Sequence, residues 1–182
     1  MTVVLRYRGR SVSATTAEAY RQNLLILVGD RDPLDVLSQT ASILDHVVCT
    51  KGETVLRTRP SPGAWTPNEV IGHLVDSEWV YGYRLRLVLS EDEPAIVGTR
   101  QDLWVQRQRH NDRAPSEQVS LFGALRQFNM AVWRRLSSAD LTRTGRHNER
   151  GEESVAMMLR MHAGHDLSHL RQIDRAVRAV ST

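Results

Sequence analysis

Three helix-start signals, each in front of an apolar helical pattern, constrain the fold of this chain most strongly. Asp32-Pro33 and Thr66-Pro67 each join a capping side chain to a proline at the first helical position, and Pro115 opens a third segment. A capping oxygen satisfies the free N–H groups of a helix start, and proline has no N–H to satisfy there. These signals predict helices that begin near residues 33, 67 and 115.

Apolar residues recur every three or four positions behind these signals and again near the C-terminus, which predicts four long amphipathic helices. They cover about 33–48, 67–90, 115–136 and a last segment that begins at Glu152 or Ser154 and ends near residue 180. A short helix is expected at 102–109, inside a crossover of about 25 residues, and no segment shows a convincing strand pattern. The predicted fold is therefore all-α, a four-helix bundle with an extra N-terminal helical segment. The predicted inward stripe of the third helix consists of Leu121, Ala124, Leu125, Phe128, Val132 and Leu136.

The domain organisation follows from the same pattern. With 182 residues, the chain is long enough for one domain with a real core. Residues 33–182 form the predicted bundle domain. Residues 1–32 are an N-terminal arm followed by a short helix from about Ala17 to Val28.

Composition narrows the class of protein. Hydrophobic residues make up 41% and charged residues 25%, as in globular proteins, and no apolar run approaches the roughly 18 residues of a membrane span. The start lacks a signal-peptide pattern and Cys49 is the single cysteine, which together predict a cytoplasmic protein without membrane contact. The net charge is +3, but the arginines are scattered, which argues against nucleic-acid binding.

Three of the seven histidines, His162, His165 and His169, lie within eight residues near the C-terminus. With about 100° per residue, all three fall on the apolar side of the last helix. His165 and His169 stand one turn apart, which lets two imidazoles reach one ion. His162 and His169 lie about 10 Å apart along the axis, so they cannot both bind it, and His162 with His165 is the weaker pair.

A third ligand must come from another helix. His73 lies on the apolar side of its own helix and is the preferred donor, whereas His46 is a weaker one. His110 and His147 fall in polar segments and are expected to be solvated. An open site of three imidazoles suits Zn²⁺ or Ni²⁺. The alternative is a hydrogen-bonded cluster of core histidines without metal.

The roles of three carboxylates and two aromatic residues near the histidines are open. Asp166 either orients a ligand imidazole or forms a helix-packing ion pair with an arginine. Asp76 and Glu78 are expected to form surface or inter-helix ion pairs rather than to act as catalytic acids. Trp65 and Tyr81 are predicted to line a pocket for substrate or cofactor, although Trp65 could simply pack onto the helix start.

Three segments, 65–78, 145–151 and 165–173, give the chain a resemblance to a known family. They read WTPNEVIGHLVDSE, GRHNERG and HDLSHLRQI. Together they resemble the DinB-like (DinB/YfiT) metal-binding superfamily over roughly residues 33–180. The resemblance implies an up-down-down-up bundle, often a homodimer, with a divalent metal held by His73, His165 and His169.

The resemblance and the histidines predict a metal-dependent enzyme that acts on small molecules, because a metal with an open position generates a nucleophile at neutral pH. Thiol S-transfer with a low-molecular-weight thiol is the first predicted reaction, and hydrolysis is the second. No catalytic acid or base is identified. The alternative is a non-enzymatic, metal-stabilised dimeric binding protein with a stress-related role.

Overall fold

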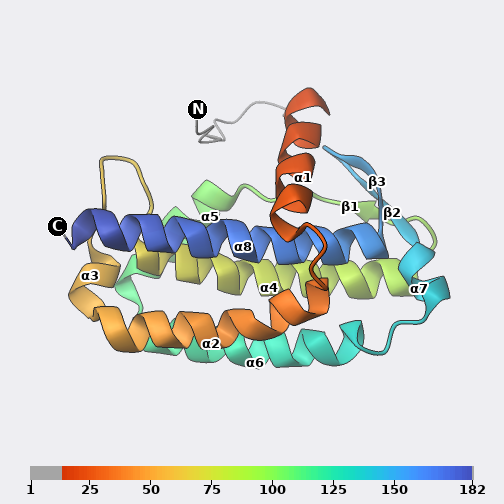
Figure 1. The fold of residues 1–182 in the computed structure, drawn as a ribbon. Helices are drawn as coiled ribbons and strands as arrows, with labels where there is room; N and C mark the ends of the chain where they lie inside the picture. The colour runs from red at the N-terminus through yellow and green to blue at the C-terminus, as the bar shows by residue number, and fades with distance from the viewer. Residues whose placement is uncertain (1–13, 182) are drawn as a thin grey trace.

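Four long helices lie side by side and form the bundle in the computed structural model, which describes residues 14–181 (Figure 1). Helices α2 and α8 run in one direction, and α4 and α6 run in the other. The predicted all-α, up-down-down-up bundle is therefore confirmed. The four helices are α2 (Pro33–Lys51), α4 (Pro67–Ser90), α6 (Pro115–Trp133) and α8 (Val155–Val180).

Short elements connect these helices. Because α4 and α6 run in the same direction, residues 91–114 must carry the chain back along the bundle, as the predicted crossover does. None of the helices within residues 14–181 is long and apolar enough to cross a membrane. The connecting elements are α3 (Glu53–Arg57), β1 (Ala95–Ile96), α5 (Gln101–Gln108), the 3₁₀ helix η1 (His110–Asp112), α7 (Ser138–Thr142), β2 (Thr144–His147) and β3 (Gly151–Ser154).

The helix starts use the side chains that the sequence singles out. The Thr66 hydroxyl accepts from the Glu69 N–H at 3.0 Å, and the Glu69 carboxylate accepts from the Thr66 N–H at 2.7 Å, so α4 begins with a complete capping box. Asp32 caps α2, and Ser154 caps α8 through the Met157 N–H. These caps fix where the two helices that carry the candidate site begin.

The expectation of no strands is wrong. Strands β1, β2 and β3 form a small sheet in that order, with β1 parallel to β2 and β2 antiparallel to β3. Their lengths of two to four residues are too short to show the alternation by which a strand is recognised in a sequence. The sheet leads directly into α8 and thereby anchors the start of the helix that carries most of the candidate site.

A polar layer divides the core. One apolar cluster includes Leu85 on α4 and Met158 on α8, and the other includes Leu74 on α4 and Ile173 on α8. Buried polar residues lie between them on these helices, among buried apolar neighbours. They include Ser77, Glu78, His162, His165 and Asp166.

The predicted inward stripe of α6 is wrong in part. Phe128 is 65% exposed and Leu121 is 44% exposed, whereas Phe122, Arg126 and Asn129 are buried. The inward side of α6 carries the polar Arg126 and Asn129 among apolar residues such as Phe122, whereas Leu125 and Val132 of the predicted stripe are partly buried. Apolar periodicity therefore misplaces the centre of the inward side of this helix.

Helix α1 (Ala14–Val28) packs across the outer side of α8 (Figure 1). It begins three residues before the predicted Ala17. The contact is tight, because a Cβ on Gly164 of α8 would lie 2.4 Å from the Leu24 carbonyl oxygen. Most of the predicted arm, residues 1–13, lies outside the described residues, and the domain boundary after residue 32 stays a prediction.

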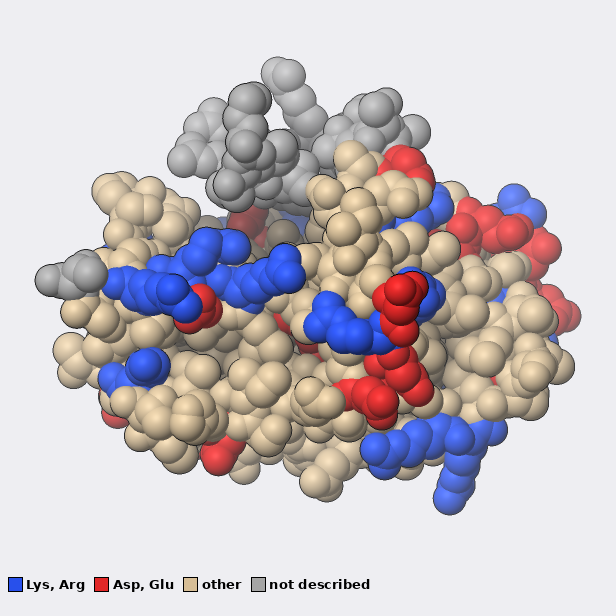
Figure 2. Space-filling model, viewed as in Figure 1, with Lys and Arg blue, Asp and Glu red and all other residues tan. Residues whose placement is uncertain are grey.

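The surface charge is dispersed on the face in Figure 2. Lysine and arginine side chains form separate groups there, with acidic and uncharged residues between them. On this face the arginines are as scattered as they are in the sequence, and the expectation that the protein does not bind nucleic acid stays a prediction.

Candidate metal centre

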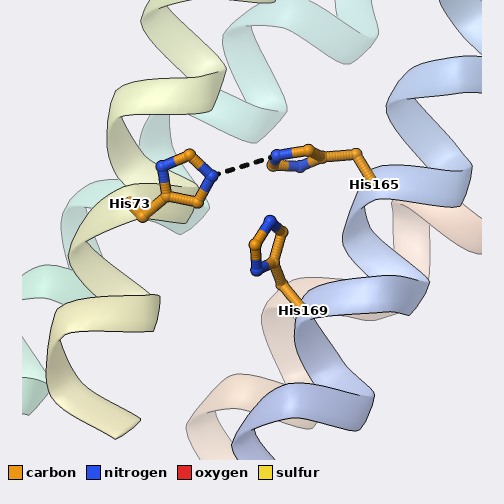
Figure 3. A group of neighbouring side chains, drawn as sticks. All are labelled: His73, His165 and His169. Atoms are coloured by element: carbon orange, nitrogen blue, oxygen red, sulfur yellow. Dashed lines mark hydrogen bonds between the residues drawn. The ribbon is translucent and has the colours of Figure 1, made fainter. Parts of the chain in front are cut away.

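Three histidines from two helices meet in the polar layer (Figure 3). His73 extends from α4, and His165 and His169 extend from successive turns of α8. One ring nitrogen of each lies within 4.8 Å of the other two, and the Nε2 atoms of His73 and His165 are 3.0 Å apart. His73 and His165 are buried, and His169 is partly buried. The structure thus brings together the three residues singled out from the sequence.

The surroundings of the three imidazoles keep them neutral. Burial lowers the pKa of His73 and of His165 well below the usual value, and the neighbouring histidines lower both further. Burial also lowers the pKa of His169 to about 4, although a hydrogen bond from its Nδ1 to Gln172 Oε1 at 2.8 Å acts in the opposite direction. Neutral imidazole is the form that binds a metal ion, and the bond to Gln172 leaves His169 Nε2 with a free lone pair.

The donor set fits a divalent ion. A tetrahedral ion holds imidazole nitrogens about 2.0–2.1 Å away, which places them roughly 3.4 Å from one another. The nitrogens of His73, His165 and His169 already lie 3.0 to 4.8 Å apart, so small side-chain rotations suffice. Two buried neutral imidazoles that face each other through Nε2 also gain from a cation between them. The three residues therefore match the ligand number and chemistry of an open Zn²⁺-type site.

The two predicted pocket residues lie on different sides of the triad. The ring centroid of Trp65 is 5.1 Å from that of His73, and its ring stacks 6.4 Å from that of His169. Tyr81 stacks on His162 at 4.0 Å and lies 6.1 Å from His165. Both aromatic rings thus hold histidines in place, and their contact with a substrate or cofactor stays a prediction.

A cavity of about 100 Å³ opens beside the triad. His73 and His165 lie in its wall, together with Tyr81. Residues of the crossover, among them Trp104, also line it. Two of the three histidines therefore border a space that a small molecule can enter, as an open metal site requires. Further lining residues are Tyr20, Asp76, Ser77, Val80, Arg84, Gly98, Thr99, Gln101, Glu149 and Arg150.

A second polar cluster lies next to the triad, and its charges are paired. Arg126 of α6 binds Glu78 of α4 at 2.6 Å and Asp166 of α8 at 2.8 Å, and donates to the Leu37 carbonyl of α2 at 2.6 Å. His162 Nε2 lies 2.9 Å from the Glu78 carboxylate. Arg126 thereby links all four long helices of the bundle.

This cluster answers the questions that the sequence left open about Asp166, Glu78 and His162. Asp166 forms the helix-packing ion pair and accepts from the Thr40 hydroxyl at 2.7 Å. Glu78 forms an inter-helix pair, and His162 and Arg126 lower its pKa to about 2 although burial acts in the opposite direction. His162 fills the core as the partner of Glu78.

Two histidines that were expected to be solvated are buried instead. His110 is 4% exposed and His147 is 3% exposed. His110 lies in the crossover and bonds Asp76 Oδ2 through Nε2 at 2.8 Å, so Asp76 is a buried partner of the crossover and not a surface ion-pair residue. The sequence did not indicate the burial of these two histidines, because their neighbours in sequence are polar and the packing of a connector depends on distant helices. His46 is exposed and does not belong to the group of candidate ligands.

The fold and the triad define a helical-bundle protein with a candidate metal centre. Residues 37–173 match the sequence model of the DinB superfamily, which is more than half of the 182-residue chain. The chain therefore belongs to the DinB superfamily.

Curated relatives and one solved structure agree with this assignment. A protein of Oceanobacillus iheyensis named "Putative metal-dependent hydrolase" is 32% identical over 72% of this chain and 76% of its own length. YfiT of Bacillus subtilis, which has the same name, is 25% identical over 78% of this chain and 82% of its own. The solved YfiT structure, described as a "probable metal-dependent hydrolase with an unusual four-helix bundle topology", matches with a TM-score of 0.67 over 94% of each chain at 24% identity, which supports the fold.

Proposed function

We propose that this chain is a metal-dependent hydrolase of small molecules, with His73, His165 and His169 as the ligands of one divalent ion. The observation that carries this proposal is the meeting of three neutral imidazoles, two of which, His73 and His165, lie in the wall of a cavity. The names of the relatives support hydrolysis over thiol transfer. Zn²⁺ and Ni²⁺ are the ions that suit a site of three imidazoles.

Bound there, such an ion polarises a carbonyl or phosphoryl oxygen and lowers the pKa of a water molecule to about 7. The chain's own residues supply the rest. Burial and their position on rigid helices keep the three imidazoles oriented, and the bond from His169 to Gln172 fixes one ring. Trp65 covers the triad on the side of His73 and His169.

Asp76 is the carboxylate that we assign to proton transfer. It lies one turn after His73 on α4 and lines the cavity. His110 bonds its Oδ2 at 2.8 Å, and the Gln108 amide donates to both oxygens at 3.1 Å. These bonds hold the carboxylate in place and leave a lone pair on Oδ1 to accept a proton from the attacking water. An Asp76→Asn variant is expected to keep the metal and lose hydrolysis at least 100-fold.

Thiol S-transfer, the first reaction predicted from the sequence, is the second candidate, because the same open site would lower the pKa of a low-molecular-weight thiol. The two reactions differ in their products. A hydrolase gives an acid and an alcohol or amine from one substrate, whereas a transferase forms a thioether or thioester only when a thiol is present. A homodimer, expected from the family resemblance, also stays a proposal.

Metal analysis of the purified, untagged protein tests the proposal first. We expect about one equivalent of Zn²⁺ or Ni²⁺ in the wild type and none in a His73→Ala, His169→Ala double variant. His46→Ala is the matched control, because it removes an exposed histidine away from the triad and should keep the metal. The metal-loaded protein is then assayed with ester, amide and phosphoester panels, with and without thiol. Metal binding without turnover on any panel would favour the non-enzymatic binding protein.

A further inference from the structure

The cavity beside the triad has a cationic end that the proposed chemistry does not use. Arg84 lies on α4, eleven residues after His73, and lines the same cavity. It is 7% exposed, and one of its nitrogens donates to the Val97 carbonyl at 2.7 Å. Within residues 14–181, Arg84 forms no ion pair with a carboxylate, although Glu153 is near enough to interact with it electrostatically. Burial lowers the pKa of Arg84 and the neighbouring Arg150 lowers it further, whereas Tyr81 and Glu153 act in the opposite direction.

Two other arginines, the buried Arg126 and the partly buried Arg150, differ from Arg84 because they pair with carboxylates. Arg126 lies between two carboxylates, and Arg150 bonds Glu153 through two of its nitrogens. A buried guanidinium without a carboxylate partner is expensive, because it loses its hydration and gains one neutral hydrogen bond in return. An anion in the cavity would supply the missing partner of Arg84.

Two neighbours of Arg84 strengthen this end as an anion site. The Tyr81 side chain lines the cavity, and burial raises the pKa of its hydroxyl to about 12, so the hydroxyl is a hydrogen-bond donor at neutral pH. Arg150 also lines the cavity, and Arg21 donates to the Arg150 carbonyl at 2.7 Å, which brings another positive charge to this end.

The acidic residues of the cavity wall limit what the anion is. Asp76 lies in the wall, and so does Glu149, whose carboxylate is beside Gly98, next to the Val97 carbonyl that Arg84 binds. A doubly charged phosphate would therefore meet two carboxylates. A single carboxylate is a better match, because the planar fork of a guanidinium binds its two oxygens side by side. The chemistry of the wall thus favours a monoanionic carboxylate.

The spacing indicates where this carboxylate lies in the substrate. Eleven residues of helix separate His73 from Arg84, which is about 16 Å between their Cα atoms, and both side chains reach into the gap. Ser77 and Val80 line the wall between them. A short, partly apolar chain would span this distance.

We propose that Arg84, assisted by the Tyr81 hydroxyl, binds a terminal carboxylate of the substrate, so that this protein acts on small carboxylic acids with a hydrolysable bond at the other end. The reaction at that other end is the hydrolysis proposed above, on which this substrate class rests. Carboxylate binding itself needs only residues of this chain and is testable without metal.

The first test is calorimetric titration of the metal-free protein with glutarate. We expect binding in the wild type, at least tenfold weaker binding in Arg84→Gln, and intermediate affinity in Arg84→Lys, which keeps the charge but not the fork. Arg107→Gln is the matched control, because it removes an equal charge from the exposed side of α5 and should bind as wild type does. Circular dichroism and thermal melts establish that each variant is folded, and Arg84→Lys carries the comparison where Arg84→Gln does not fold.

Any one of three results of this titration would overturn the carboxylate site. The first is that glutarate binds Arg84→Gln as tightly as it binds the wild type. The second is that the uncharged glutaramide binds the wild type as well as glutarate does, and the third is that inorganic phosphate binds more tightly than glutarate. The last result would assign the cavity to phosphate compounds instead.

The second test compares two esters on the metal-loaded protein. Water cleaves mono-p-nitrophenyl glutarate to glutarate and p-nitrophenol, and the methyl ester of the same compound has no free carboxylate. In the wild type we expect at least a tenfold higher kcat/KM for the free acid than for the methyl ester. Arg84→Gln should lose this preference, and the control Arg107→Gln should keep it. Glutarate binding that depends on Arg84, without turnover of either ester, would support the carboxylate site and contradict the hydrolase. Equal turnover of both esters without glutarate binding would contradict the carboxylate site alone.

Discussion

Two groups of buried polar side chains lie side by side in the bundle, and they differ in whether their partners are inside the protein. The Glu78, Arg126, His162 and Asp166 cluster pairs its charges with one another across all four long helices. The triad of His73, His165 and His169 has ring nitrogens that face one another and no charged partner, and two of its members border a cavity. Groups whose charges are paired hold helices together, whereas converging neutral donors are available to a ligand.

The largest expected effect comes from breaking the paired cluster. Arg126→Met should leave two buried carboxylates, on Glu78 and Asp166, without their cation, and lower the free energy of unfolding by about 3–5 kcal/mol. Urea unfolding of the metal-free protein measures this. Arg178→Met, which removes an exposed arginine from α8, should change stability by less than about 1 kcal/mol. Equal stabilities of the two variants would show that the cluster does not hold the bundle together.

As the pH falls, the triad and the paired cluster should lose their contributions to the free energy of unfolding at different pH values. His169 has a folded-state pKa of about 4, below its unfolded value near 6.5, so its stabilisation is present above pH 6.5 and is lost as the pH falls to 4. Glu78 has a folded-state pKa of about 2, so its contribution is present above about pH 4.5 and is lost only below it. We expect at most about 3 kcal/mol from His169.

Urea unfolding of the metal-free protein between pH 7.5 and 3 tests this order. His169→Gln should make the fall between pH 6.5 and 4 less steep, with the rest of that fall coming from His73, His165 and His147, whose pKa values are also lowered, and it should leave the contribution of Glu78 below pH 4.5 unchanged. A wild-type curve that is flat from pH 6.5 to 4.5 would contradict a buried, neutral triad.

A smaller effect is expected on the outer face of the helix that carries the triad. Gly164→Ala would place a Cβ 2.4 Å from the Leu24 backbone, so α1 and α8 must separate, and stability should fall by about 1–3 kcal/mol. Gly123→Ala on α6 is the matched control, because nothing lies within 4 Å of its added Cβ, and it should stabilise the protein by about 0.5–1 kcal/mol. Thermal melts compare the two. Equal effects would mean that α1 does not pack closely beside His165.

The sequence predicts the bundle and the triad because both depend on local patterns. Caps and apolar periodicity mark the helices, and His165 and His169 share a helix face by spacing alone. The inward face of α6 could not be predicted, since Arg126 and Asn129 are buried only because Glu78 faces them from another helix. The same reason hid the burial of His110 and His147 and the cationic end of the cavity, because contacts between distant segments leave no periodic signal.

Zinc titration of two histidine variants tests the central difference most directly. His165→Ala removes a member of the triad, and His162→Gln removes a buried histidine one turn away that belongs to the paired cluster. Calorimetry on both folded proteins should show no Zn²⁺ binding in His165→Ala and one equivalent, with wild-type affinity, in His162→Gln. Zinc bound by His165→Ala but not by His162→Gln would assign the metal to the other cluster and contradict this account.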